Sequence, residues 1–307
     1  MSTGSKKKRD TLPNFLIVGA AKAGTNSLYL CLKQHPEIFM SSPKEPHFIT
    51  AQFCGKLQDR RGDYSTKPVQ DYDSYLRLFE GASGKKAVGE ASVDNLYHYD
   101  PAIMYIKKFI GVPRIIIILR NPVDLAFSAY TSLVRDNREY LSFEEALGME
   151  EQRKQEGWIH IWLYKDSGFY YNQVKAYMDN FAHVKICLFD DLKKDTLALV
   201  KELYEFLEVD PSFVPKMTRC NVSGIPRYRK LHNLFVERTP LQSIIRTAGK
   251  LILGEDRWIM LRESVRTRLL QKTTINPETR ERLKEAYRED ILKLQTLIKK
   301  DLTPWLT

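Results

Sequence analysis

An α/β fold, in which helices flank a parallel sheet and a helical cap follows at the C-terminus, is predicted by three features of this 307-residue sequence. Short apolar runs alternate with segments of helical periodicity. A glycine-bounded loop separates the first apolar run from the first helical segment, and the chain ends in a long amphipathic stretch. Such alternation is typical of parallel sheets whose strands are joined by right-handed helical crossovers.

Four apolar runs have the length and composition of buried parallel strands. The predicted strands are Phe15–Gly19, residues 87–89, Arg114–Leu119 and residues 184–189. The third is the most apolar, since its arginine is followed by four isoleucines and a leucine.

Helical patterns lie between these strands and after the last of them. The predicted helices span residues 27–34, 101–110, 123–135, 170–181, 196–207 and 277–300. The final one is the clearest, because Pro277 marks its start and Leu283 and Tyr287 begin an apolar series at helical spacing.

The domain organisation is predicted to be simple. Residues 1–12 are interpreted as a disordered basic tail, and residues 13–307 as a single domain. Residues 44–75, rich in charge, Gly and Tyr, are interpreted as a long loop over one edge of the sheet. Residues 240–274 are basic and amphipathic, and we interpret them as a cap, a substrate-side insertion or a partner surface, or simply a surface excursion.

The composition limits the class of protein. Hydrophobic residues make up 43% and charged residues 28%, as in an ordinary globular protein. The net charge of +10 favours an anionic ligand, substrate or surface, although solubility alone would also account for it. No run approaches the ~18 apolar residues that a membrane span needs.

The cysteines and the N-terminus predict a cytoplasmic protein. The basic residues of the N-terminus lead into no apolar segment, which a secretory signal would require. The four cysteines are scattered and form no C-x-x-C pair, so we expect reduced thiols rather than a disulfide framework or a zinc site.

The loop after the first strand has the features of an anion-binding site. Gly19 and Gly24 are spaced as in a Walker A loop, but Thr25 follows the second glycine and the lysine lies inside the loop, at Lys22. Glycines allow backbone N–H groups to converge on an anion, and the N-terminus of the next helix adds a partial positive charge. A tight strand–helix turn without a ligand is the simpler alternative.

A nucleoside triphosphatase would need two further groups. They are a lysine after the second glycine, and an acidic residue at the end of a neighbouring strand to hold Mg²⁺. Here the strand Arg114–Leu119 is followed by Arg120 instead. We therefore expect a P-loop-like sheet that binds a metal-free anion balanced by cations.

A second motif follows that strand. Pro122 starts a helix directly after it, so Arg120 lies at the strand end and Ser128 about two turns into the helix. A guanidinium and a hydroxyl so placed can bind one phosphate together. With the first loop, this pair predicts a nucleotide that has two separate phosphate positions.

These two motifs, in this order, resemble those of sulfotransferases that use 3′-phosphoadenylyl sulfate (PAPS). The chain looks like a bacterial-type member close to the heparan-sulfate and glycan branch. The resemblance extends from Pro13 to the C-terminus, so that residues 13–307 resemble one sulfotransferase domain. It implies an enzyme that transfers a sulfuryl group from PAPS to a hydroxyl or amine of a carbohydrate, glycolipid or other small metabolite.

The resemblance also implies which residues bind the nucleotide. The loop residues bind the 5′-phosphosulfate, the arginine–serine pair binds the 3′-phosphate, and a later loop folds over the nucleotide. Carried over to this sequence, the nucleotide-binding residues are Lys22, Ala23, Gly24, Thr25, Asn26, Ser27, Arg120, Ser128, Tyr170, Gly224, Arg227 and Arg229.

The reaction needs a group that stabilises the leaving phosphate and a base for the acceptor hydroxyl. Lys22 is expected to stabilise the leaving group. The stretch that contains Lys44, Glu45 and His47 resembles a segment of the glycan branch in which the glutamate is the base, and His47 is the rival candidate. Lys44, together with Glu90 and Ser92 after the second predicted strand, is expected to contact the acceptor.

Two other function classes stay open. One is a P-loop kinase or NTPase, and the other is a basic, non-enzymatic module that binds a nucleotide or a nucleic acid. The expected partners are PAPS, its product adenosine 3′,5′-diphosphate (PAP) and a hydroxyl-bearing acceptor, without nucleic acid or metal. The basic segment 240–274 permits contact with a membrane surface, and no oligomeric state is predicted.

Overall fold

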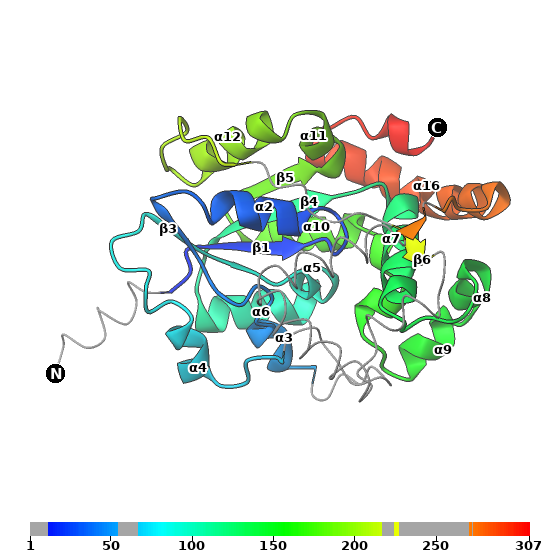
Figure 1. The fold of residues 1–307 in the computed structure, drawn as a ribbon, viewed down its shortest axis with the longest axis horizontal. Coiled ribbons are helices and arrows are strands. Elements are labelled where there is room, and N and C mark those ends of the chain that lie inside the picture. Colours follow the sequence, from blue (N-terminus) through cyan, green and yellow to red (C-terminus); the bar gives the residue numbers. More distant parts are fainter. Residues whose placement is uncertain (1–11, 55–66, 217–223, 227–269, 272) are drawn as a thin grey trace, which may run out of the picture.

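The sheet at the centre of the molecule is parallel and has helices on both faces, as the computed structural model shows (Figure 1). The structure describes residues 12–54, 67–216, 224–226, 270–271 and 273–307. Arg227, Arg229, the tail up to residue 11 and most of the segment 240–274 lie outside the described residues.

Five strands form this sheet, in the order β2-β3-β1-β4-β5. They are β1 (Phe15–Gly19), β2 (Ile38–Met40), β3 (Ala87–Ala91), β4 (Arg114–Leu119) and β5 (Val184–Leu188). β1 is central and pairs in parallel with both β3 and β4. Its five residues are all buried, as expected of a strand that is covered on both faces.

Helices cover the two faces of the sheet. Figure 1 shows α2 on one side and α5 and α6 on the other. The α-helices are α2 (Thr25–Leu32), α3 (Phe48–Ala51), α4 (Tyr72–Arg77), α5 (Asp94–Tyr97), α6 (Tyr99–Phe109), α7 (Pro122–Arg135), α8 (Phe143–Gly148), α9 (Glu150–Gln155), α10 (Tyr171–Asn180), α11 (Phe189–Lys194), α12 (Thr196–Phe206) and α16 (Pro277–Ile298).

Shorter elements complete the described chain. Three 3₁₀ turns are η1 (His160–Trp162), η2 (Asp166–Gly168) and η3 (Thr303–Trp305), and a small antiparallel pair joins β6 (Ile225–Pro226) to β7 (Leu270–Gln271). None of the helices in the described ranges is long and apolar enough to cross a membrane.

The predicted strands and helices are confirmed, although some of their ends differ. All four predicted strands and all six predicted helices are present. The strand β2 was not predicted, β3 extends two residues beyond the predicted end, and Phe189 begins α11 instead of ending β5. The interpretation of residues 44–75 as one loop is wrong, because α3 lies within that segment and α4 begins in it.

The parallel order places five chain segments at one edge of the sheet. The residues that follow each of the strands β1 to β5 leave the sheet at its carboxyl edge, where open α/β sheets bind their ligands. Both predicted phosphate motifs follow strands of this set. The topology therefore brings them together although they are about a hundred residues apart in the sequence.

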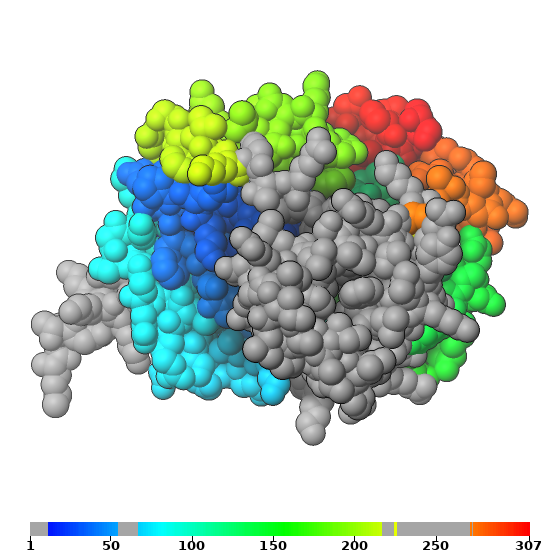
Figure 2. All heavy atoms as spheres, in the orientation of Figure 1, coloured from blue at the N-terminus to red at the C-terminus, as the bar shows by residue number. Residues whose placement is uncertain are grey.

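The C-terminal helix α16 packs on α10 and α7. The carboxylate of Asp290 in α16 accepts hydrogen bonds from the backbone N–H groups of Tyr170 (2.8 Å) and Tyr171 (3.2 Å), at the start of α10. Beyond α16, the indole of Trp305 donates to Asp190 (3.1 Å) in α11. Figure 2 shows the C-terminal segment beside the α11–α12 segment on the surface.

Candidate active site

A cavity of about 360 Å³ opens at the carboxyl edge of the sheet. Its wall combines the loop after β1, the segment before α3, one face of α7 and the residues around η1. It is lined by Ala21, Lys22, Gly24, Thr25, Asn26, Ser27, Lys44, Glu45, His47, Val93, Arg120, Ser128, Ser132, Leu133, Asp136, Arg138, Ile159, His160, Ile161 and Phe189.

The loop between β1 and α2 presents backbone N–H groups and short polar side chains to this cavity. Gly24 stands at the N-cap of α2 with φ +98°, and a Cβ there would lie 2.7 Å from the Leu192 side chain. Only glycine meets both conditions without strain. Thr25, Asn26 and Ser27 begin the helix and line the cavity, whereas Ala23 is buried behind the wall.

Lys22 lies on the cavity wall in the left-handed region of backbone conformation, with φ +62°. Its ammonium group donates to the hydroxyl of Ser132 at 3.1 Å. Burial and the positive charge of Arg135 lower the pKa of Lys22 to about 8. The ammonium is therefore much closer to losing its proton than an ordinary surface lysine.

Arg120 follows β4 and fixes the phosphate loop. Its guanidinium donates to the backbone carbonyl of Lys22 (3.1 Å) and lies 4.8 Å from the centre of the Phe189 ring. Ser128, two turns into α7, lines the same cavity. The two members of the second predicted motif thus share one wall with the first motif.

Glu45 and His47 line the same cavity as the loop after β1. Both residues have left-handed backbone conformations, with φ +60° and +53°. The carboxylate of Glu45 pairs with the ammonium of Lys44 and lies 3.8 Å from Nε2 of His47.

Asp94, from α5, completes this group from behind. Its Oδ2 lies 2.8 Å from Nδ1 of His47, and the carboxylate is fully buried. Burial lowers the pKa of His47, but the Asp94 carboxylate outweighs this effect and the pKa is raised. Burial raises the pKa of Asp94, yet its contact with His47 holds that pKa well below the usual range. The pair therefore favours an imidazolium next to a carboxylate.

Five of the predicted site residues that the structure describes do not line the cavity, namely Ala23, Glu90, Ser92, Tyr170 and Gly224. Glu90 is buried within β3, where its carboxylate accepts a hydrogen bond from the Tyr75 hydroxyl (2.9 Å). Ser92 is buried too, and its hydroxyl oxygen accepts from the backbone N–H of His47 (3.2 Å). Both residues lie behind the wall and do not line the cavity, and Oε1 of Glu90 is buried without a hydrogen-bond partner in the described structure.

Tyr170 was expected to bind the nucleotide, but it does not line the cavity. Its ring is fully buried, and its hydroxyl donates to the backbone carbonyl of Arg120 (3.0 Å). Gly224 is buried and does not line the cavity either. The nucleotide contacts predicted for Arg227 and Arg229 stay predictions, since both residues lie outside the described ranges.

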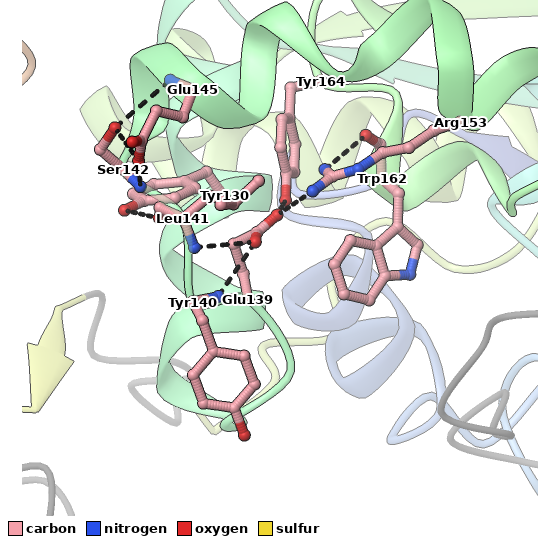
Figure 3. A network of polar contacts seen from close by, with 9 residues as sticks. All are labelled: Tyr130, Glu139, Tyr140, Leu141, Ser142, Glu145, Arg153, Trp162 and Tyr164. Atoms are coloured by element: carbon pink, nitrogen blue, oxygen red, sulfur yellow. Dashed lines mark hydrogen bonds and ion pairs between the residues drawn. The ribbon is translucent and has the colours of Figure 1, made fainter.

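A buried ion pair supports the wall on the η1 side (Figure 3). The carboxylate of Glu139 accepts from the Arg153 guanidinium (2.7 Å) and the Tyr164 hydroxyl (2.8 Å). It also accepts from the backbone N–H groups of Tyr140 (3.0 Å) and Leu141 (3.1 Å). Four donors satisfy this carboxylate completely, which makes a buried charge tolerable.

This network joins the turn after α7 to the segment around η1. Arg153 lies 5.1 Å from the centre of the Trp162 ring, and Arg138 lies 5.5 Å from it on the cavity side. His160, in the same segment, is neutral at physiological pH because burial lowers its pKa to about 4. The η1 wall therefore offers apolar and neutral groups together with one guanidinium.

Sequence reasoning missed several residues of the site. Asp94, Ser132, Arg138 and His160 belong to no local motif. A signal existed for Ser132, which lies one helical turn beyond Ser128 and hence on the same face of α7. Among the residues that the structure describes, no group of His, Cys, Asp or Glu could hold a metal ion.

Comparisons with known proteins place the chain in a family. A family model described as "Sulfotransferase family" matches residues 13–213. A solved sulfotransferase from Alicyclobacillus acidocaldarius is 34% identical, with a TM-score of 0.75, and the match covers 96% of this chain and 99% of that one.

Two human proteins are also similar. Carbohydrate sulfotransferase 15 is 30% identical over 165 residues, which are 44% of this chain and 29% of that protein. Bifunctional heparan sulfate N-deacetylase/N-sulfotransferase 3 is 28% identical over 218 residues, which are 68% of this chain and 24% of that protein. The chain thus spans less than a third of the length of these relatives. Since the family model covers well over half of the sequence, the chain belongs to the sulfotransferase family.

Proposed function

We propose that this chain transfers a sulfuryl group from PAPS to a hydroxyl or amine of an acceptor such as a carbohydrate, glycolipid or other small metabolite. Residues 13–307 would form one sulfotransferase domain. The observation that carries the proposal is the pair of cations on the cavity wall. Lys22 and Arg120 are only partly exposed, yet within the described ranges neither forms an ion pair with a carboxylate. Buried cations need a compensating charge, so an anionic ligand is expected between them.

The predicted roles follow the two motifs. The backbone N–H groups and side chains of residues 22–27 would hold the 5′-phosphosulfate, and Arg120 with Ser128 would hold the 3′-phosphate. Arg120 also donates to the loop that carries Lys22, so the two anion-binding motifs are mechanically linked. Hydroxyls, amides and cations are the donor set that phosphate and sulfate oxygens require.

We assign the general base to Glu45. Its carboxylate lines the cavity, whereas the Asp94 contact outweighs the effect of burial and favours a charged imidazole at His47, which cannot accept a proton. In this scheme Glu45 takes the proton of the acceptor hydroxyl as the acceptor oxygen bonds to sulfur. Lys22 stabilises the charge that appears on the phosphate oxygen when its bond to sulfur breaks. Lys44 would orient Glu45 and contact the acceptor.

A carbohydrate acceptor is supported by the names of the human relatives. A cytoplasmic location is proposed from the cysteine pattern, since the four cysteines are scattered along the sequence and form no C-x-x-C pair. We also propose that the reaction needs no metal. A kinase or a nucleic-acid-binding module finds no comparable support, because the family model that matches the chain is that of a sulfotransferase.

Calorimetric titration with PAP, with and without magnesium, tests the proposal. We expect metal-independent binding that weakens at least about 30-fold in Arg120→Ala, because a bidentate charged contact is lost. Arg114→Ala is the matched control, since Arg114 stands at the opposite end of the same strand and pairs with Glu208. Its affinity for PAP should match the wild type. Binding of ATP only with magnesium, or salt-sensitive binding of DNA without PAP, would contradict the proposal.

A further inference from the structure

The hydroxyl of Ser132 is contacted by two cations at once. It accepts a hydrogen bond from the Lys22 ammonium at 3.1 Å and another from the Arg135 guanidinium at 3.2 Å. The two positive groups are therefore no farther apart than the sum of those distances. Arg135 also pairs with Asp136 (3.2 Å), which compensates part of its charge. Two cations that meet at one neutral oxygen form a locally positive part of the wall.

The geometry leaves the proton of this hydroxyl available. A serine hydroxyl has two lone pairs and one proton, and here both lone pairs accept from cations. In the described part of the chain no acceptor is found for the Ser132 proton, and Ser132 lines the cavity beside Lys22. Donors on both lone pairs also polarise the O–H bond, which makes it a stronger donor.

We propose that Ser132 is a further substrate-binding and catalytic residue, whose hydroxyl donates to an oxygen of the sulfuryl group during transfer. The inference rests on the proposed function, because it places that group next to Lys22. In the reaction the bond between sulfur and the phosphate oxygen breaks and a bond between sulfur and the acceptor oxygen forms. The electron pair stays on the phosphate oxygen beside Lys22. Ser132 holds the sulfuryl oxygens in place while both bonds are partial.

The competing explanation is that Ser132 only anchors Lys22. Comparing the affinities for PAP and PAPS distinguishes this explanation from the proposed contact. PAP lacks the sulfuryl group, so its affinity should not depend on a contact to sulfuryl oxygens. If Ser132 merely positioned Lys22, its removal would affect both ligands through the displaced ammonium. The difference between the two affinities thus reports on the proposed contact alone.

The test is calorimetric titration of Ser132→Ala with PAP and with PAPS, without acceptor. We expect the affinity for PAP to stay within about twofold, and that for PAPS to fall about tenfold, as for a lost hydrogen bond to a charged group. Turnover should fall further, by about 100-fold, as when one preorganised donor is removed from a transition state.

Thr131→Ala is the matched control. Thr131 is the preceding residue of α7, and its hydroxyl donates to the backbone carbonyl of Ser128 (3.3 Å) inside the helix. It does not line the cavity, so both affinities should stay at the wild-type value. Ser132→Thr keeps the hydroxyl, so its affinity for PAPS should be close to that of the wild type.

Three outcomes would overturn the inference. Unchanged affinities for both ligands would mean that Ser132 makes no such contact. Equal losses for PAP and PAPS would mean that it acts only by anchoring Lys22. If the wild-type protein bound neither ligand, the proposed function would fail, and the role of Ser132 would fail with it.

Discussion

The protonation state of the Lys22 ammonium should limit the rate of the reaction at high pH. A lysine with a pKa of about 8 is charged below that pH and neutral above it, and only the charged form can stabilise a leaving phosphate. We expect kcat/KM for PAPS to fall as the pH rises above about 8, because this parameter reports on the free enzyme. A pH profile between roughly 6 and 10 measures this directly.

Arg135 provides the control for that profile. Its positive charge is the second cause of the lowered pKa of Lys22, after burial. Arg135→Ala should therefore move the alkaline limb of the profile to higher pH. A wild-type profile that stays flat up to pH values near the ordinary lysine pKa of about 10.4 would exclude Lys22 as the limiting group.

Glu45 and His47 can be separated by two variants. Glu45→Gln keeps the shape of the side chain but cannot accept a proton, so we expect kcat to fall by at least about 100-fold while PAP affinity stays within about twofold. His47→Ala should lose less turnover, since His47 is not the base in our assignment and lies 3.8 Å from the Glu45 carboxylate. Steady-state kinetics with labelled PAPS and a panel of glycan acceptors gives both values. If Glu45→Gln stayed active and His47→Ala were inactive, His47 would be the base.

At the scale of elements, the buried pair Glu139–Arg153 should dominate the stability of the η1 wall. Both side chains are almost fully buried, with exposures of 3% and 5%. Arg153→Met leaves the Glu139 carboxylate buried without its counter-charge, and we expect a loss of about 3–5 kcal/mol in the free energy of unfolding. Urea denaturation followed by circular dichroism measures the difference.

An exposed ion pair of the same chemistry is the comparison. Arg280 in α16 pairs with Asp124 in α7 at 2.8 Å, and both side chains are about 40% exposed. Arg280→Ala should change the free energy of unfolding by less than about 1 kcal/mol, because solvent screens such pairs. Equal losses in the two variants would show that the Figure 3 network has no special stabilising role.

Elements with a strong local pattern were predicted correctly from the sequence. β4 was placed to the residue, because an uninterrupted run of apolar residues has few other structures open to it. β2 was missed since three residues, Ile38–Met40, are too few for any periodicity. The end of β3 was placed too early, because Glu90 is a charged residue, and its burial beside the Tyr75 hydroxyl is not evident from the sequence.

The candidate site was predictable only where its residues are close in sequence. The loop with Lys22 and the pair Arg120 and Ser128 follow strands directly, and these residues do line one cavity. The contact between His47 and Asp94 joins residues that are 47 positions apart, and no local pattern indicates it. Tyr170 was misplaced for a related reason. Its hydroxyl bonds to a backbone carbonyl, which leaves no trace in the sequence.

At the scale of the whole molecule, the net charge of +10 should speed the encounter with an anionic nucleotide. Stopped-flow measurements of PAP binding should show an association rate that falls by about tenfold between low and high salt, with a smaller change in the dissociation rate. Potassium acetate and sodium chloride at equal ionic strength should lower the association rate to the same extent. An association rate independent of salt would mean that the excess positive charge serves solubility alone.

Hydrogen bonds connect the C-terminal helix α16 to the candidate active site. Asp290 of α16 holds the backbone at Tyr170, and the Tyr170 hydroxyl holds the carbonyl of Arg120. Arg120 in turn bonds to the phosphate loop at Lys22. Three successive hydrogen bonds thus link the position of α16 to that of the loop that carries Lys22.

Lys22, Glu45 and His47 share a backbone conformation that side chains with a Cβ rarely adopt. Each such residue holds about 1–3 kcal/mol of conformational strain. Glycine at these three positions would relieve that strain, but it would also remove the ammonium, the carboxylate and the imidazole. Attempts to raise the melting temperature of this protein by selecting on stability alone should therefore drift toward variants that fold better and no longer turn over substrate.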